Sequence, residues 1–264
     1  MRISFRLGVA GTFLAMVAVN ALAALLPING VTPGEVSDAY PNLFAPAGIT
    51  FSIWSVIYLL LAAHTLYQCG VWQQPIAREK TEVLHRVGVW FSVSSLVNAA
   101  WIFAWHYRVL WLSLLLMLTL LVCLIRIMEM INKETLSQRE KWLVRLPFSL
   151  YFGWITVAAI ANVTTLLVSL GWSGFGVAES TWTILALAVG MLVGIAALLR
   201  FGTVAYGVVL VWAYGGIWLK HTAADGFAGA YPSVITTVLL CMGLFAGAIA
   251  CVLFRKRREN LLGR

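Results

Sequence analysis

Residues 110–128 read LWLSLLLMLTLLVCLIRIM, a run of 19 residues with a single charged side chain, Arg126. A helix needs about 20 mostly apolar residues to cross the roughly 30 Å of hydrocarbon in a bilayer. Similar apolar runs occur at seven other places, residues 7–28, 46–69, 87–107, 147–170, 181–199, 203–219 and 232–254. The sequence therefore predicts an all-α integral membrane protein, a polytopic helical bundle of about eight transmembrane helices.

The cationic side chains divide unequally between the two ends of these runs. With the runs alternating in direction, 16 of the 18 Lys and Arg residues fall on one side, and only Arg108 and Lys220 fall on the other. Short cytoplasmic loops carry the excess of positive charge in membrane proteins. Both termini are therefore predicted to be cytoplasmic, and the chain is expected in a bacterial inner (plasma) membrane.

Composition narrows the class of protein further. Hydrophobic residues make up 61 % of the chain and charged residues 11 %, whereas soluble domains average about 25 % charged residues. The net charge of +8 lies in the connections and in the tail RKRR at residues 255–258. The expected partner is therefore the lipid bilayer and not nucleic acid. Because little of the chain lies outside the apolar runs, residues 1–264 are predicted to form a single membrane domain.

The N-terminus has two interpretations. Arg2 and Arg6 precede an apolar run that contains Ala21-Leu22-Ala23, a pattern also typical of a secretory signal peptide and its small-residue cleavage site. The run extends to Leu26, which is longer than a usual signal-peptide core and favours a retained helix. Cleavage would leave seven spans and would not change the orientation of the others.

The runs lack the acidic residues needed for ion transport and the side-chain groupings needed for metal binding or conventional catalysis. No Asp or Glu occurs within them, which argues against proton pumps and ion-coupled carriers. The four Cys and four His residues lack metal-ligand spacing, so no metal site is predicted. The lone intramembrane His64 is more typical of hydrogen bonding within the bundle than of haem ligation. No Ser/His/Asp set or carboxylate pair is evident, so no catalytic residue and no enzymatic activity are predicted.

Local signals mark some of the connections between runs. Ser137 with Glu140 three residues later has the pattern of a capping box, which predicts a short helix leading into the fifth run. The connections at residues 106–108 and 200–202 are short, so the runs that they join are predicted to form antiparallel hairpins.

Aromatic and amide side chains recur at helical spacing in three of the runs. Positions three, four, seven or eleven residues apart share one face of a helix. The three stripes are Trp54 and Tyr58; Asn98, Trp101 and Trp105; and Tyr151, Trp154, Ala158 and Asn162. Stripes that face one another would line an apolar cavity with a few hydrogen-bonding groups, as in small-molecule sites generally. The alternative is that they pack helix against helix, with Asn amides bridging the helices.

Taken in order, the stripes resemble the motifs of the TspO/MBR family, the tryptophan-rich sensory proteins and the translocator protein. The matching segments are APAGITFSIWSVIY at residues 45–58, NAAWIF at 98–103, and Tyr151, Trp154 and Asn162 in the fifth run. Members of that family have five spans. The chain is therefore identified as a distant, enlarged member, with a TspO/MBR-like segment at 45–170, an extra N-terminal span at 7–28 and additional C-terminal spans at 181–254. It departs from the family at Gly48, where the family's first turn has a Trp.

The resemblance implies a ligand class. Members bind tetrapyrroles such as porphyrin and haem, and some bind sterols, in a pocket lined by Trp and Asn. The resemblance thus implies a cavity for a planar apolar ligand in a sensor or carrier, with porphyrin or haem as ligand and not as resident cofactor. The expected lining residues are Trp54, Tyr58, Asn98, Trp101, Tyr151, Trp154, Ala158 and Asn162. Light-dependent porphyrin degradation is implied by the resemblance alone.

A second function stays open at this point. A small-solute permease is favoured by the extra spans and by the glycines of the sixth and seventh runs, although these glycines are explained more simply as close-packing sites. The sequence also leaves open whether the protein forms a homodimer.

Overall fold

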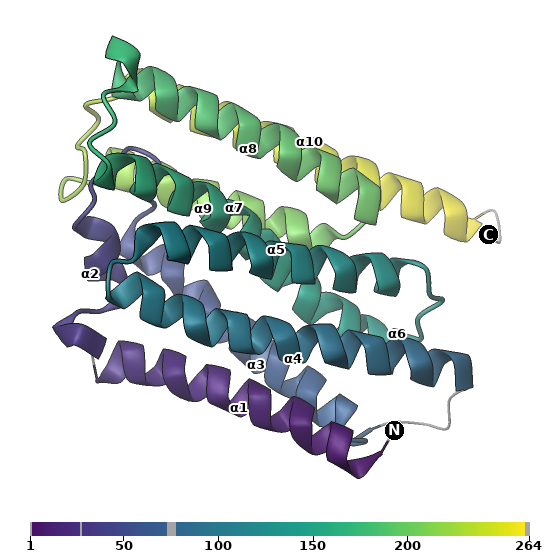
Figure 1. The fold of residues 1–264 in the computed structure, drawn as a ribbon. Coiled ribbons are helices and arrows are strands. Elements are labelled where there is room, and N and C mark those ends of the chain that lie inside the picture. Colours follow the sequence, from purple (N-terminus) through teal and green to yellow (C-terminus); the bar gives the residue numbers. More distant parts are fainter. Residues whose placement is uncertain (1, 27, 73–77, 262–264) are drawn as a thin grey trace. The chain divides into compact units, whose positions relative to one another are not determined.

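The computed structural model describes residues 2–26, 28–72 and 78–261, and within these ranges every regular element is a helix (Figure 1). The chain divides into two compact units. The first comprises Met1–Ala39 and Ile53–Ile155, and the second comprises Tyr40–Ser52 and Thr156–Arg264. In chain order the elements are α1 (Ile3–Leu25), η1 (Ile28–Gly30), α2 (Pro33–Asp38), η2 (Gly48–Ser52), α3 (Ile53–Gln68), α4 (Arg78–His106), α5 (Leu110–Asn132), α6 (Gln138–Glu140), the π-helical turn η3 (Lys141–Arg145), α7 (Leu146–Ser169), η4 (Gly174–Gly176), α8 (Glu179–Phe201), α9 (Val204–Thr222) and α10 (Pro232–Leu261).

Seven of the described helical segments are long and apolar enough to cross a membrane, which confirms the predicted polytopic helical membrane protein. They are Ile3–Leu25, Gly48–Gln68, Lys80–His106, Leu110–Asn132, Gln138–Ser169, Glu179–Phe201 and Pro232–Glu259. The remaining predicted run, residues 203–219 and seventh in chain order, forms the helix α9 but is not among the seven candidate spans. Its Tyr, Trp and Gly residues and its polar end at Lys220 and His221 lower its mean hydropathy. The structure therefore supports seven candidate spans where the sequence predicts about eight.

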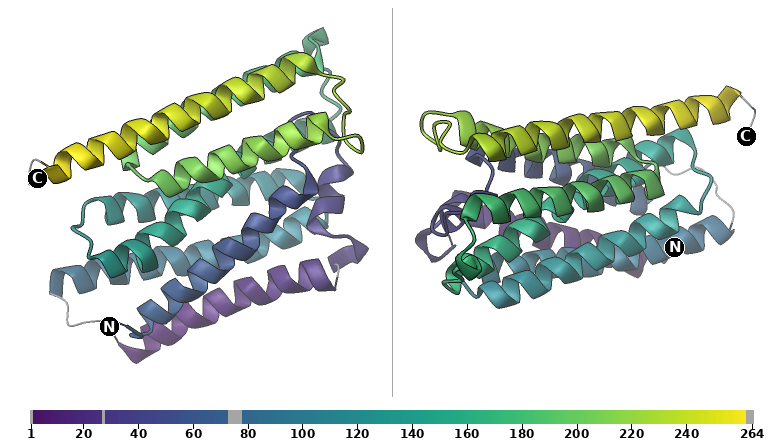
Figure 2. Two further views of the ribbon diagram at one scale, coloured as in Figure 1. Left: turned by 180° about the vertical axis from the view of Figure 1, so that it is seen from behind. Right: turned by 90° about the horizontal axis from the view of Figure 1, so that it is seen from above.

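In the first unit, α1 and α4 run in the same direction, side by side (Figure 1). The rings of Phe13 on α1 and Phe91 on α4 lie 6.0 Å apart, and Asn20 of α1 reaches Asn98 of α4. The neighbouring helix α3 runs the opposite way and ends beside the start of α1 (Figure 2). There the guanidinium of Arg6 donates a hydrogen bond to the carbonyl oxygen of Cys69, at 3.0 Å.

Polar contacts join the connections at the end where α1 and α4 begin. The predicted capping box is confirmed, with the Ser137 hydroxyl accepting from the Glu140 N–H and the Glu140 carboxylate accepting from the Ser137 N–H. The same carboxylate, which is 2 % exposed, pairs with the ammonium of Lys80 at 2.7 Å. The α6 turn is thereby attached to α4.

His64 is held by hydrogen bonds inside the first unit. Its Nδ1 lies 2.8 Å from the carbonyl oxygen of Leu143 in the π-helical turn η3. Since a carbonyl can only accept, Nδ1 carries the proton and Nε2 is an acceptor, which the Gln68 amide faces at 3.4 Å. Both ring nitrogens are therefore occupied within the bundle, as the sequence favours.

In the second unit, α8, α9 and α10 pack closely through glycines. The Tyr214 hydroxyl on α9 donates to the carbonyl oxygen of Leu187 on α8, at 2.8 Å. A Cβ at Gly190 would lie 2.6 Å from that hydroxyl, and one at Gly194 would lie 2.6 Å from Leu210. These glycines allow the helices to approach, which is the usual role of small residues between membrane helices.

The segment 40–52 also belongs to the second unit and lies along α9. The Ala47 N–H donates to the carbonyl oxygen of Gly216 at 2.9 Å, and the Trp212 indole donates to the carbonyl oxygen of Thr50 at 2.9 Å. The indole N–H of Trp212 therefore has a backbone acceptor. The proline turn that precedes α3 is fixed to α9 by these bonds.

Candidate functional site

Trp54, at the start of α3, is the centre of a cluster of aromatic rings in the first unit. Its ring stacks on Tyr58 at 5.3 Å between centroids and lies 6.4 Å from Trp101 of α4, with planes nearly parallel. Tyr151 and Trp154 of α7 meet it edge-on, at 5.8 and 6.2 Å. Members of all three predicted stripes therefore meet around the Trp54 indole, namely Tyr58, Trp101, Tyr151 and Trp154.

A chain of hydrogen bonds runs beneath these rings. The Asn98 amide of α4 donates to the Tyr151 hydroxyl of α7 at 2.9 Å, and the Asn20 amide of α1 donates to the Asn98 carbonyl oxygen at 2.7 Å. Asn98 and Tyr151 are both fully buried. Because each of these polar groups is paired, the hydrogen bonds hold α1, α4 and α7 together. They also fix how far the stripes on α4 and α7 are shifted along the helix axes relative to one another.

The hydroxyl of Tyr58 differs from these paired groups. Within the described residues it is buried and has no hydrogen-bond partner. An unsatisfied buried hydroxyl costs about 1–3 kcal/mol. The rings of Tyr58 and Trp54 are themselves only half-buried, so this polar group lies next to surface that a further molecule can cover.

The cluster continues along α4 to the far end of the unit. Trp105 stacks on Trp101 at 5.9 Å, and its indole N–H donates to the carbonyl oxygen of Pro33 at 3.1 Å. Pro33 begins α2, whose capping box pairs Thr32 with Glu35. Hydrogen bonds from Thr32 lower the pKa of the Glu35 carboxyl. The segment 28–39 is thus bonded to Trp105, the last aromatic residue of the stripe on α4.

Two of the predicted site residues belong to the other unit. Ala158 and Asn162 belong to the part of α7 in the second unit, where the buried Asn162 amide donates to the carbonyl oxygen of Ala158 at 3.0 Å. Their role in ligand binding stays a prediction.

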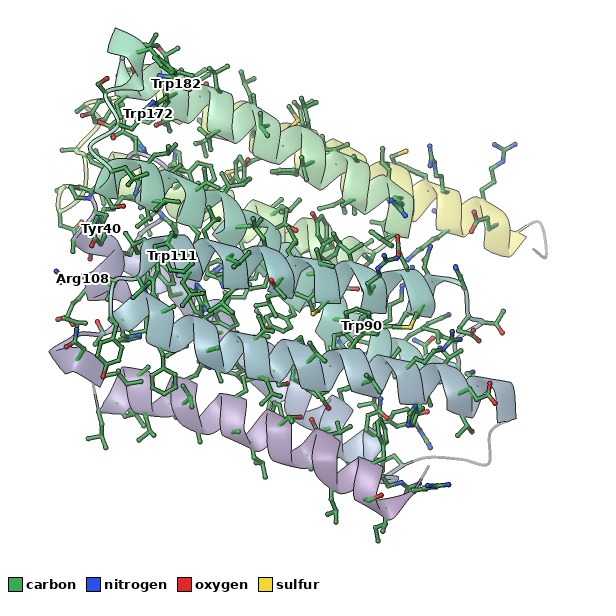
Figure 3. All side chains as sticks on the ribbon, in the orientation of Figure 1. Tyr40, Trp90, Arg108, Trp111, Trp172 and Trp182 are labelled. Atoms are coloured by element: carbon green, nitrogen blue, oxygen red, sulfur yellow. The ribbon has the colours of Figure 1, made fainter. Side chains whose placement is uncertain are left out.

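Two participants were not among the predicted site residues. Asn20 of α1 donates a hydrogen bond to Asn98, which is itself a predicted site residue. Trp105 belongs to the second stripe but was not among the expected lining residues, and its indole N–H is bonded inside the unit. The exposed Trp111 lies at the start of α5, at the turn of the α4–α5 hairpin, and the half-buried Trp90 lies near the middle of α4 (Figure 3).

The site offers stacking surfaces and hydrogen bonds. Among the residues that the structure describes, no group of three or more His, Cys, Asp or Glu could hold a metal ion. The Trp54 cluster contains no acidic or basic side chain, so its chemistry suits a flat, largely apolar molecule with a polar edge.

Comparison with known proteins shows a similarity that covers more of the chain than the motifs at residues 45–170 do. A family model described as TSPO-like protein matches residues 6–251. The match includes the span at 7–28 and most of residues 181–254, which the motifs at 45–170 leave outside. No curated protein matches the chain, and no solved structure does.

Proposed function

The chain belongs to the TSPO-like protein family, and on that premise we propose that the Trp54 cluster binds a planar apolar ligand, a tetrapyrrole, in a membrane sensor or carrier. The observation that carries this proposal is the meeting of four aromatic rings on one half-buried indole, beside a buried hydroxyl with no partner among the described residues. A buried hydroxyl in a core that only packs is as a rule hydrogen-bonded.

In the proposed complex the ligand lies on Trp54 and Tyr58, whose rings keep exposed surface. Indole faces stack on a flat conjugated ring system, and the Tyr58 hydroxyl pairs with a polar group at its edge. The buried Asn98–Tyr151 pair supports the rings from behind and need not open when the ligand enters. Binding then removes a penalty that the unliganded protein carries at Tyr58.

The proposal includes the topology. We place both termini in the cytoplasm of a bacterial cell, with α9 as an eighth crossing of the inner membrane. The division of 16 against 2 cations supports this placement. In the first unit, Lys80 lies near the start of α4 and Arg108 lies at the far end of that helix (Figure 3).

The alternative of a small-solute permease receives no support from Gly190 and Gly194, two of the glycines that suggested it. Gly190 and Gly194 face Tyr214 and Leu210 at distances that leave no room for a methyl group. They serve close packing and do not indicate a path for a solute.

Titration of the full-length protein in lipid nanodiscs with protoporphyrin tests the proposal. Saturable quenching of tryptophan emission, with a stoichiometry that does not depend on the amount of lipid, is the expected result. Quenching that rises in proportion to lipid would mean that porphyrin merely dissolves in the bilayer. Uptake assays in proteoliposomes would then become the next test, for the permease.

A further inference from the structure

An open hollow of about 670 Å³ lies in the first unit, where α1 and α4 begin side by side. Its lining includes Arg2, Ser4 and Phe5 from the start of α1 and Glu82, His85 and Arg86 from the first turns of α4. Both helices start at this end of the unit (Figure 1). The hollow lies at the opposite end of α4 from the rings of Trp101 and Trp105, and the proposed function does not use it.

Two lining residues of the hollow, Phe5 and His85, form a packed aromatic pair. The ring of Phe5 stacks on the imidazole of His85, with centroids 4.0 Å apart and planes 27° from parallel. The same ring presses against Gly88, where a Cβ would lie 2.8 Å from it. Because Gly88 has no side chain, the Phe5 ring can pack against it, and this packing holds the Phe5–His85 pair in place.

The walls favour an anion. Arg2 and Arg86 contribute two guanidinium groups, against one carboxylate from Glu82. In addition, Arg2 at the N-cap of α1 makes no side-chain capping bond, and the first turn of α1 has no acidic residue. The positive end of that helix dipole is therefore not offset by the helix itself, and it adds to the attraction of the arginines for an anion.

The apolar surface next to the hollow points to the source of that anion. Ile3 and Leu7, on the same turns of α1, are 77 % and 67 % exposed, as expected of a helix that faces lipid. A ligand with its phosphate in the hollow could lay acyl chains along these side chains. A free phosphate ion would leave them uncovered.

We propose that this hollow binds the phosphate-bearing headgroup of an anionic membrane lipid, with Arg2 and Arg86 contacting the phosphate and the acyl chains lying against Ile3 and Leu7. Basic pockets between membrane helices bind such headgroups by the combination of charge and shape. Arg6, the next arginine of α1, is not part of the hollow, since its guanidinium donates to the carbonyl oxygen of Cys69.

Native mass spectrometry of the full-length protein tests this proposal through the number of phosphatidylglycerol molecules that it retains. The double variant Arg2→Gln/Arg86→Gln should bind phosphatidylglycerol roughly thirty-fold more weakly, since each cation near the headgroup contributes about one factor of five. The matched control is Arg257→Gln/Arg258→Gln, which removes the same charge from exposed positions at the end of α10. The control should retain most of the binding.

Three outcomes would overturn the proposal. Equal losses in the two double variants would mean that only general surface charge attracts the lipid. Equal retention of phosphatidylcholine would remove the requirement for an anion. Displacement of phosphatidylglycerol by millimolar inorganic phosphate, abolished in Arg2→Gln/Arg86→Gln, would keep the phosphate site but replace the lipid by a soluble ligand.

Discussion

The amide of Asn98 on α4 donates a hydrogen bond to the hydroxyl of Tyr151 on α7, at 2.9 Å, and both side chains are fully buried. The bond joins two of the three stripes that the sequence shows. It lies directly beside the Trp54 cluster, because Tyr151 also meets the Trp54 ring edge-on at 5.8 Å. The polar pair therefore determines where the aromatic surfaces stand relative to one another.

A double-mutant cycle on Asn98→Ala and Tyr151→Phe should measure this bond. Interhelical hydrogen bonds in membrane proteins contribute roughly 0.6–1.7 kcal/mol, so the coupling free energy should fall in that range. The measurement is the unfolding free energy in mixed micelles. Strictly additive losses would show that the two side chains do not interact.

Tyr58→Phe should separate ligand binding from stability. The variant keeps the ring that stacks on Trp54 but removes a buried hydroxyl with no partner among the described residues. The unliganded protein should become more stable, by up to about 1–3 kcal/mol, because that desolvation penalty disappears. Porphyrin affinity should fall about two- to tenfold through the loss of one hydrogen bond. Unchanged affinity would remove the hydroxyl from the binding site.

Gly216→Ala should destabilise the second unit. A Cβ at Gly216 would collide with the side chain of Thr50, and the overpacking should cost about 1–3 kcal/mol. Gly215→Ala is a matched control, since its Cβ meets only Met242, at 3.8 Å, and alanine favours the helix. Thermal unfolding of both variants in one detergent provides the comparison. Equal melting temperatures would contradict the contact between α9 and the segment 40–52.

Lys80→Met should destabilise the first unit far more than Arg126→Met. Lys80 pairs with the carboxylate of Glu140, whose side chain is 3 % exposed, whereas Arg126 pairs with Glu129 at the surface. Leaving a buried carboxylate without its cation costs about 3–5 kcal/mol, and a surface pair contributes about 0–1 kcal/mol. Chemical unfolding of the two variants checks the difference. Similar losses would mean that water reaches Glu140 freely.

The sequence predicts the elements because their signals are local. The apolar runs give the spans by length and composition, and the Ser137–Glu140 pattern gives the short helix before α7. The run at residues 203–219 is the exception: the helix α9 forms there, but its aromatic residues and glycines lower its hydropathy. Some of these residues make contacts with neighbours, as Gly216 does with Thr50. The π-helical turn at Lys141–Arg145 has no such local signal.

The site is predictable only in part. Helical spacing shows which residues share one face of a helix, but it does not show which other helix that face contacts. The spacing groups Trp54 with Tyr58 and Asn98 with Trp101, but it does not reveal that these pairs meet. The link from Asn20 to Asn98 depends on α1 and α4 lying side by side, a long-range relationship without a local pattern.

The central claim is that Trp54 provides a stacking surface for a planar ligand, and protoporphyrin binding by Trp54→Ala tests it most directly. The loss of one stacking indole should weaken binding roughly ten- to hundredfold, corresponding to about 1–3 kcal/mol. Trp111→Ala, which removes an indole that is 64 % exposed at the start of α5, should bind as the unaltered protein does. Equal affinities in the two variants, both folded, would contradict the proposed site.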